Sequence, residues 1–451
     1  MPTLRMKSLP ARLAVLTAAL LQTASIASAQ ARATEVTGEI DAVYAQADAL
    51  YRDLHRQPEL SGHEEKTAAT LAAGLKALGF EVTTGVGKTG VVGVLKNGAG
   101  PVVLLRTELD GLPVEEKTGL DYASTARTKD DNGVDVGLMH ACGHDIHMAA
   151  WMTTARIMAG TRNRWAGTLV LIGQPAEETL RGAQWMLDDG LLTRFPRPDF
   201  GLAIHDDARY PAGLIGYRAG PVLSNSDTIR VTIFGAGGHG ARPETTIDPV
   251  VIAARTVLAL QTIVSREVSP FDSAVITVGT IHAGTKANII PSEARIELSV
   301  RSLTDKVRAH LLSAIDRIVK AEAVAGRSPK EPVIDRFDGT DALVNDAALT
   351  QRVSGALLRA LGPERVKEVE PEMASEDFSR FHKAGIPTLT LRVGAATPAA
   401  FEASEKGGAP LPSLHSPLFA PDRERTLKGA IIAEVLSLRE LMPVGSGSVG
   451  R

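Results

Sequence analysis

The sequence has 451 residues, 44% of them hydrophobic, and its 49 Lys and Arg nearly balance its 52 Asp and Glu, giving a formal net charge of −3. This composition excludes a disordered chain and a protein that coats nucleic acid, and the length favours two or three domains. The single cysteine excludes an internal disulfide.

The first 29 residues are typical of a secretory signal peptide. Arg5, Lys7 and Arg12 form a basic start, residues 13–21 are apolar, and Ala27 and Ala29 are the small residues at which signal peptidases cut. We therefore expect an exported protein, periplasmic or secreted, with an uncleaved anchor as the alternative. The apolar run is shorter than the roughly 20 residues that cross a bilayer, and no later stretch looks long enough. Cleavage after Ala29 removes three basic residues and leaves a charge of −6.

Strands and helices alternate in the first half of the mature chain. Residues 40–79 have helical apolar spacing, and a further helix is expected at 148–158. Short apolar runs at 91–95, 102–105, 168–173 and 201–205 predict strands. This alternation predicts an α/β domain with a mostly parallel sheet, whose reactive groups gather beyond the carboxyl ends of the strands.

The pattern changes after residue 217. Ile229, Val231 and Ile233 alternate with polar residues, and then come a helix at 248–265, strands at 274–281 and 294–300 and a helix at 306–325. This β-α-β-β-α order is typical of a ferredoxin-like layer. An apolar strand at 387–393 returns to the first pattern. We therefore expect a catalytic domain in two pieces, 30–219 and 331–444, a lid or dimerisation domain at 220–330, and a disordered tail at 445–451.

Residues 140–147 carry the densest chemistry, with one thiol, three imidazoles and a carboxylate within eight positions. Thiolate and imidazole together suit zinc, manganese or a related divalent ion, and Cys142 and His144 can point in one direction from an extended turn. On this segment alone, two alternatives remain open. One is a buried cysteine among surface histidines, and the other is a cysteine nucleophile with a histidine base.

Further candidates lie beyond the predicted strands. Glu177 and Glu178 follow the strand at 168–173, so one could bind a metal while the other acts as general base on the attacking water. His205 ends the next strand, and His415 lies in a proline-rich loop near the C-terminus. Two adjacent glutamates are common on protein surfaces, and a lone histidine is more often structural than a ligand. The set that together could hold two divalent ions is Cys142, His144, Glu178, His205 and His415.

Eight segments spread over nearly the whole mature chain form an ordered pattern. They are LHRQPELSGHE (54–64), LLRTELDGLPVEEKTG (104–119), MHACGHDIHMAA (139–150), GQPAEET (173–179), GAGGHGARP (235–243), ANIIPSEA (287–294), SEDFSRF (375–381) and LHSPLF (414–419). The pattern resembles the di-metal amidohydrolase branch of the aminoacylase and carboxypeptidase metallohydrolase family, which includes hippurate hydrolases, N-acyl amino acid amidohydrolases and auxin-conjugate hydrolases. HACGHD with PAEE at this spacing is highly specific. The resemblance implies a mixed-sheet, zinc-exopeptidase-like catalytic domain with an inserted ferredoxin-like α+β domain.

The resemblance also implies roles for individual residues. It makes the same five residues ligands of two divalent ions per subunit, and such a donor set accepts manganese, zinc, cobalt or nickel. It makes Glu177 the general base, which takes a proton from the attacking water and later delivers it to the leaving amine. Asp110 corresponds to the carboxylate that orients a ligand imidazole, with a plain turn residue as the alternative.

Three residues of the smaller domain correspond to the family's substrate-binding groups. His239 corresponds to the histidine that reaches the substrate carbonyl, often from the partner subunit, and would stabilise the developing oxyanion. Asn288 and Arg301 correspond to groups that hold the substrate's free carboxylate, although an exposed cation is the alternative for Arg301. The resemblance therefore also implies a homodimer through this domain.

The sequence departs from the family pattern at several positions. The branch usually has Asp where Glu108 stands and histidine where Glu244 stands, and Asp206 and Asp207 replace an aromatic stretch after His205. We expect these changes to give a more acidic and less aromatic rim, which favours polar or basic substrates over bulky apolar acyl groups.

The sequence therefore predicts an exported, metal-dependent amidohydrolase that cleaves N-acyl amino acids, in the manner of hippurate, into a carboxylic acid and an amino acid. A dipeptidase or carboxypeptidase of the same fold differs only on the acyl side of the amide and remains open. A cysteine-nucleophile amidase and a non-catalytic metal-binding protein are further alternatives, although binding alone would not need Glu177. The expected partner is a small molecule, with no nucleic acid and, after signal cleavage, no membrane.

Overall fold

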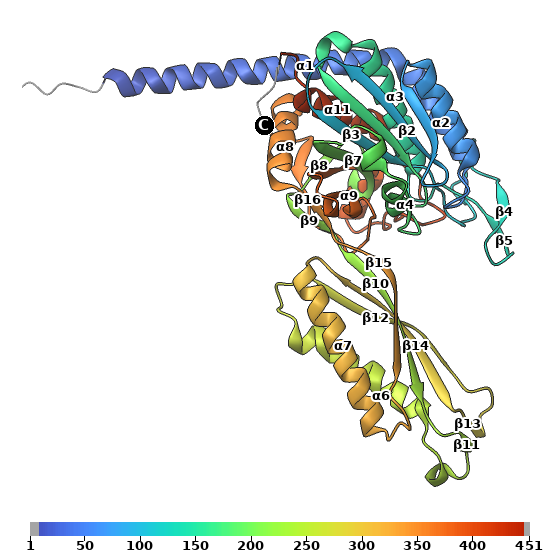
Figure 1. The fold of residues 1–451 in the computed structure, drawn as a ribbon. Coiled ribbons are helices and arrows are strands. Elements are labelled where there is room, and N and C mark those ends of the chain that lie inside the picture. Colours follow the sequence, from blue (N-terminus) through green and yellow to red (C-terminus); the bar gives the residue numbers. More distant parts are fainter. Residues whose placement is uncertain (1–8, 446–451) are drawn as a thin grey trace, which may run out of the picture. The chain divides into compact units, whose positions relative to one another are not determined.

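The computed structural model describes residues 9–445 and divides the chain into two compact units (Figure 1). The first unit takes in the chain up to Arg218, Asp346–Val369 and the part from Ile386 onward, and the second takes in Ala219–Asn345 and Glu370–Gly385. The first eight residues of the expected signal peptide and residues 446–451 of the expected tail lie outside the described residues.

The first unit is built on an eight-stranded mixed sheet with the order β1-β2-β6-β3-β7-β18-β8-β17. Strands β6, β3, β7 and β18 run parallel in the centre, and β2 and β8 pair antiparallel with the two outer members of this group. The central strands are nearly continuous apolar runs because both faces of the sheet are covered. The strands are β1 (Glu81–Val86), β2 (Gly90–Asn97), β3 (Val102–Glu108), β6 (Gly167–Gln174), β7 (Phe200–Pro211), β8 (Ile215–Tyr217), β17 (Val366–Glu368) and β18 (Thr388–Ala396), with a separate hairpin of β4 (Arg127–Lys129) and β5 (Asp135–Gly137).

Helices cover this sheet and form much of its core. Helix α3 packs against β3 and β7, α11 packs against β7 and β18, and α1 lies over α3, α8 and α11. In α1, Ala29, Ala33, Val36 and Ile40 are buried at steps of three or four residues, which is the spacing of one helix face. The helices are α1 (Leu9–Arg56), α2 (Glu65–Ala77), α3 (His144–Gly160), α4 (Gly182–Asp188), α5 (Leu191–Arg194), α8 (Ala347–Leu361), α10 (Pro398–Glu405) and α11 (Arg423–Leu441).

The second unit has a four-stranded antiparallel sheet with the order β12-β14-β10-β15. Its chain order is β10 (Asn225–Phe234), α6 (Pro249–Thr262), β12 (Ala274–Ala283), β14 (Glu293–Ser302), α7 (Asp305–Ala325) and β15 (Val333–Thr340), which is the ferredoxin-like β-α-β-β-α-β arrangement. Alternate residues of β10 and one side of each helix form its core. Smaller elements are β9 (Gly220–Leu223), β11 (Gly238–His239), β13 (Ile289–Ile290), β16 (Leu343–Asn345) and α9 (Ser379–Lys383).

The second unit extends beyond the boundary expected at residue 330. Strand β15 pairs with β10 and so belongs to the sheet of the second unit. Residues 370–385 join the same unit, because Ser224 N donates to Ala374 O at 2.8 Å and Glu372 N donates to Val222 O at 2.9 Å. These pairings are long-range, so the local pattern of apolar residues did not reveal them.

One helical segment of the second unit, Pro249–Glu267, is long and apolar enough by length and composition to cross a membrane, with a mean hydropathy of 1.2. The sequence had led us to expect no such stretch after the N-terminal run. A third of this segment is buried within the protein, and α6 packs on β10, β12 and β14. Its apolar side therefore serves as a core face of the unit.

Candidate metal centre

The five expected ligands come together at one edge of the sheet in the first unit. Glu178 follows β6, and Cys142 and His144 lie at the start of α3. His205 lies within β7 rather than at its end. It is nevertheless level with the end of β3, because Arg106 pairs with Ala203, and both Glu108, which ends β3, and His205 lie two positions further on. This is the edge at which the carboxyl ends of parallel strands gather functional groups.

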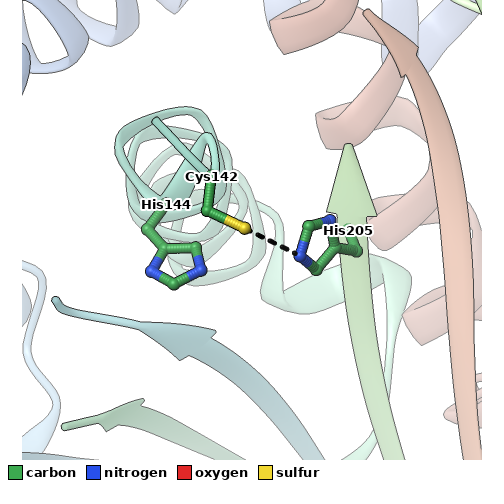
Figure 2. Close-up of side chains that lie close together, drawn as sticks. All are labelled: Cys142, His144 and His205. Atoms are coloured by element: carbon green, nitrogen blue, oxygen red, sulfur yellow. Dashed lines mark hydrogen bonds between the residues drawn. The ribbon is translucent and has the colours of Figure 1, made fainter. Parts of the chain in front are cut away.

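The Cys142 thiol lies at the middle of this group. Its Sγ atom is 3.7 Å from His205 Nε2 and 3.3 Å from His415 Nε2. Figure 2 shows the Cys142 side chain pointing from the start of α3 toward His205 on the neighbouring strand, with His144 beside it. Glu178 completes the group, since its carboxylate lies 3.4 Å from His415 Nε2 and 4.0 Å from His144 Nε2.

Glycine is required between the two ligands of the α3 turn. Gly143 has φ of 77°, in the left-handed region that residues with a Cβ atom rarely adopt. A Cβ atom at this position would also collide with the carboxylate of Asp206. The glycine therefore lets Cys142 and His144 face the same space.

These side chains fit a divalent cation. Thiolate, imidazole and carboxylate are the donor types that zinc and related ions take. His144 Nε2 is buried and has no hydrogen-bond partner among residues 9–445, which leaves it available to a metal. His205 Nδ1 lies 2.7 Å from Asp206 O, so that the ring can donate there and present Nε2 to an ion.

The excess of negative charge in the group also favours binding of a cation. Burial lowers the pKa of His144, but the Asp110 carboxylate and the other nearby carboxylates outweigh it and raise that pKa to about 10. Burial and the neighbouring carboxylates, Glu178 first, raise the pKa of the Cys142 thiol well above its usual range. A bound cation would relieve this excess of negative charge and favour the thiolate.

Glu177, the expected general base, lies beside the candidate ligands. The residue is 5% exposed and its Oε2 atom lies 3.8 Å from His144 Nε2. A carboxylate so placed can exchange a proton with a water molecule bound in the group while remaining shielded from bulk solvent.

Asp110 supports the group in a different way from the one expected. His144 Nδ1 lies 2.8 Å from the backbone carbonyl of Asp110, whereas its carboxylate Oδ1 is 3.5 Å away. The same carboxylate accepts hydrogen bonds from Ser61 Oγ at 2.6 Å and from Glu178 N at 2.9 Å. Asp110 thus orients the imidazole mainly through its main chain and holds the glutamate loop with its side chain.

Three of the four acidic residues expected at the rim lie inside the protein instead. Glu108, Asp206 and Asp207 are at most 2% exposed, because each is bonded inside the protein. Glu108 pairs with Arg106 and with His147 Nδ1 at 2.9 Å, and Asp206 N donates to His147 Nε2 at 2.9 Å. The expected preference for polar or basic substrates therefore has no support from these three residues.

Two buried networks that the sequence analysis missed support the α3 turn. The first is the His147 network just described, in which His147 lies one turn after His144 on the same helix. In the second, His55 Nδ1 lies 2.6 Å from Asp145 Oδ2 and its Nε2 lies 3.1 Å from Glu116 Oε1. Except for Asp206, these residues fall within the recognised motifs, but the motifs do not show which of them pair.

The expected substrate-binding residues lie in the second unit. His239 in β11 pairs with Ile289 of β13, and Gly240 N donates to Asn288 O at 2.9 Å, so His239 and Asn288 are close neighbours. Strand β14 begins at Glu293, and Arg301 lies eight residues later, near the end of the strand. This separation corresponds to about 25 Å along a strand. Its Nη1 atom donates to Met373 O at 2.8 Å and to Ser375 Oγ at 3.0 Å. The structure thus brings His239 and Asn288 together but not Arg301.

Known proteins share this arrangement of motifs and fold. Residues 104–406 match the family model described as peptidase family M20/M25/M40. The chain is 34% identical over 395 residues to thermostable carboxypeptidase 2 of Saccharolobus solfataricus, covering 86% of this chain and 94% of that protein. It is 36% identical over 334 residues to the hippurate hydrolase of Campylobacter jejuni, covering 74% and 84% respectively.

Among solved structures, the YXEP protein of Bacillus subtilis, described as a dinuclear metal binding peptidase from the M20 family, matches with a TM-score of 0.71 and 27% identity, covering 88% of this chain and 98% of that one. The family match, the identities and the shared fold agree with one another. The chain therefore belongs to peptidase family M20/M25/M40 and is a metal-dependent amidohydrolase.

Proposed function

We propose that the protein is a di-metal N-acyl amino acid amidohydrolase, which cleaves an amide beside a free carboxylate and releases a carboxylic acid and an amino acid. The observation that carries the proposal is the buried Glu177 carboxylate, 3.8 Å from His144 Nε2 within the group of candidate ligands. Relatives named as a hippurate hydrolase and a carboxypeptidase support the same substrate geometry, since both activities act on an amide next to a carboxylate.

Cys142, His144, Glu178, His205 and His415 would hold the two ions, and their sulfur, nitrogen and oxygen donors suit manganese, zinc, cobalt or nickel. When bound, such ions supply Lewis acidity to the scissile carbonyl and lower the pKa of the attacking water. The chain supplies the proton transfers. Glu177 takes a proton from the water as it attacks and gives it to the leaving nitrogen, while Asp110 and Asp206 fix the orientation of the imidazoles at His144 and His205.

Arg301 is the proposed anchor for the substrate carboxylate. Its guanidinium group is half-buried, burial lowers its pKa, and no carboxylate of residues 9–445 pairs with it. A guanidinium group in this state favours binding of an external carboxylate.

His239 and Asn288 would act on a substrate held by another copy of the chain. They lie at the end of the unit opposite Arg301. In a homodimer that places this end of one copy beside Arg301 of the other, the three residues would surround one substrate. The family resemblance of the GGHGARP segment supports the same role for His239, as a donor to the developing oxyanion.

Export through the N-terminal signal remains part of the proposal and rests on the sequence. Expression in a Gram-negative host followed by intact-mass analysis of the periplasmic fraction would test it. The expected mass is that of a chain beginning at Gln30, and a full-length chain retained in the membrane fraction would contradict it.

The substrate assignment is tested with purified, metal-reconstituted protein on a panel of amides. The panel contains N-benzoylglycine, N-acetyl amino acids, dipeptides and N-blocked peptides, each beside its methyl ester as a matched control. We expect hydrolysis of N-acyl amino acids and loss of activity on esterification, because Arg301 needs a free carboxylate. Preference for unblocked dipeptides would favour the dipeptidase alternative.

Metal removal separates the metal mechanism from a cysteine nucleophile. Treatment with a strong chelator should abolish hydrolysis, and added manganese or zinc should restore it. Activity that survives complete chelation but is lost on thiol alkylation would replace the proposal with the cysteine-nucleophile amidase.

A further inference from the structure

The loop that carries Glu177 and Glu178 has an unusual backbone. Ala176 and Leu180 have φ of 51° and 57°, in the left-handed region that is unfavourable for residues with a Cβ atom. The loop also closes tightly on itself, because Arg181 N and Gly182 N both donate to Ala176 O at 3.2 Å. Such a backbone persists only where surrounding contacts hold it.

Glu64 contacts this loop at Ala176, one of its two residues with positive φ. Its side chain is fully buried, and its Oε1 atom accepts a hydrogen bond from Ala176 N at 2.8 Å and another from Gly62 N at 2.7 Å. Its Oε2 atom accepts from Thr89 Oγ1 at 2.5 Å. A carboxylate 112 positions earlier in the sequence thus binds the main chain directly before the proposed general base.

The neighbouring segment reinforces this contact. Ser61, three residues before Glu64, donates to the Asp110 carboxylate, which in turn accepts from Glu178 N at 2.9 Å. The loop between α1 and α2 therefore reaches both ends of the Ala176–Glu178 turn, with Glu64 at one end and the Ser61–Asp110 pair at the other.

We propose that Glu64 is a positioning residue for the reaction: it holds Ala176 in the left-handed conformation that directs Glu177 and Glu178 toward His144. Without this acceptor, the buried Ala176 N–H loses its bond and the residue can relax to an ordinary backbone conformation. That change would rotate the two glutamates away from the candidate metal ligands. The proposal rests on the proposed function only for the role of Glu177.

The main test is E64A, measured by cobalt binding and by steady-state kinetics. The wild-type protein should take up two equivalents of Co²⁺ with a thiolate-to-cobalt absorption band from Cys142. In E64A one tight equivalent and the thiolate band should remain, because Cys142 lies on another segment, while the second ion binds about 10- to 100-fold more weakly. For the best amide of the substrate panel, kcat should fall by a similar factor with KM changed less than about threefold.

E64Q is the rescue variant. The amide oxygen of glutamine can accept from Gly62 N and Ala176 N, and its NH₂ group can donate to Thr89 Oγ1. We therefore expect kcat and cobalt stoichiometry close to those of the wild type.

E59A is the matched control from the same loop. The Glu59 carboxylate accepts from Thr67 N at 2.8 Å and from Thr67 Oγ1 at 2.9 Å, so it binds the start of α2 and not the glutamate loop. We expect E59A to lower Tm but to leave kcat and the cobalt stoichiometry unchanged.

A second-site change tests the backbone argument directly. In E64A/A176G, glycine adopts the left-handed conformation without cost. We therefore expect kcat or cobalt affinity to be at least tenfold higher in the double variant than in E64A. If E64A does not fold, E64D takes its place, because the shorter side chain cannot reach Ala176 N from the same backbone position.

Three results would overturn the proposal. They are an E64A protein whose kcat and cobalt binding match the wild type, an E64Q protein as impaired as E64A, and an E59A protein with the same losses as E64A. The cobalt measurements need no substrate. If the wild-type protein binds two cobalt ions but cleaves none of the amides, the proposed function fails and cobalt binding alone decides the role of Glu64.

Discussion

Cys142 Sγ and His415 Nε2 lie 3.3 Å apart although 273 positions separate them in the sequence, and the same sulfur lies 3.7 Å from His205 Nε2. One thiol thus contacts two imidazoles from distant parts of the chain. The only cysteine of the sequence is buried at this point. Its place suits a metal ligand shared by the whole group rather than a disulfide partner.

Replacing this thiol should weaken metal binding before it affects the fold. In C142S the hydroxyl group is a poor ligand, so we expect metal affinity to fall by more than about 100-fold, beyond the loss typical of residues that only support a ligand. Competition titration against a chelator measures the affinity, and circular dichroism checks the fold. Unchanged affinity in a folded C142S protein would exclude Cys142 as a ligand.

Replacing Glu177 should lower kcat while leaving metal binding intact. E177Q keeps the size of the side chain but cannot take a proton, so kcat should fall by about 10² to 10⁴ while two metal equivalents remain bound. Kinetics and metal analysis on the same sample check both parts. Activity within tenfold of the wild type would assign the proton transfers to another group.

The His55 pair with Asp145 predicts a pH-dependent contribution to stability. Burial lowers the pKa of His55, but the hydrogen bonds to Asp145 and Glu116 outweigh it and raise that pKa to about 9. Because the folded pKa lies above the ordinary value near 6.5, the contribution is complete below about pH 6.5 and is lost as pH rises through about 9.

The difference in unfolding free energy between wild type and H55Q should therefore be largest near pH 6, on the order of 3 kcal/mol, and small by about pH 9.5. Urea unfolding at a series of pH values measures it. A difference that is constant over this range would show that His55 is not held protonated by its two carboxylates.

Glu434 predicts a second loss of stability as pH rises, over a lower pH range. This carboxyl group on α11 is 1% exposed, Thr154 Oγ1 donates to its Oε2 atom at 2.6 Å, and burial raises its pKa to about 8. Since the unfolded chain loses this proton near pH 4.5, the folded state binds the proton more tightly and the unfolding free energy falls as pH rises from about 4.5 to 8.

E434Q removes that proton-binding difference while keeping the shape of the side chain. Relative to the wild type, its Tm should be nearly equal at pH 5 and higher at pH 8.5, where the stabilisation is on the order of 3 to 5 kcal/mol. Calorimetry at the two pH values measures the change. An E434Q protein less stable than wild type at pH 8.5 would mean that Glu434 is paired and charged.

The family and the fold class predicted from the sequence were confirmed, because both depend on signals that are local along the chain. The alternation at Ile229, Val231 and Ile233 marked β10, and the buried strands at 91–95 and 102–105 lie within β2 and β3. The boundary at residue 330 was wrong, because β15 belongs to the second unit through its pairing with β10, which lies about a hundred residues earlier.

The sequence by itself determined which residue types are available to the candidate site, because motif spacing fixes side chains that share one turn, as with Cys142 and His144. Only the tertiary structure decided which distant groups pair once they are buried. It turned the expected acidic rim at Asp206 into a buried partner of His147, and it placed Glu64 against Ala176. The physical reason is that a buried charge or N–H group must find a partner, and sheet packing rather than sequence spacing decides which partner lies within reach.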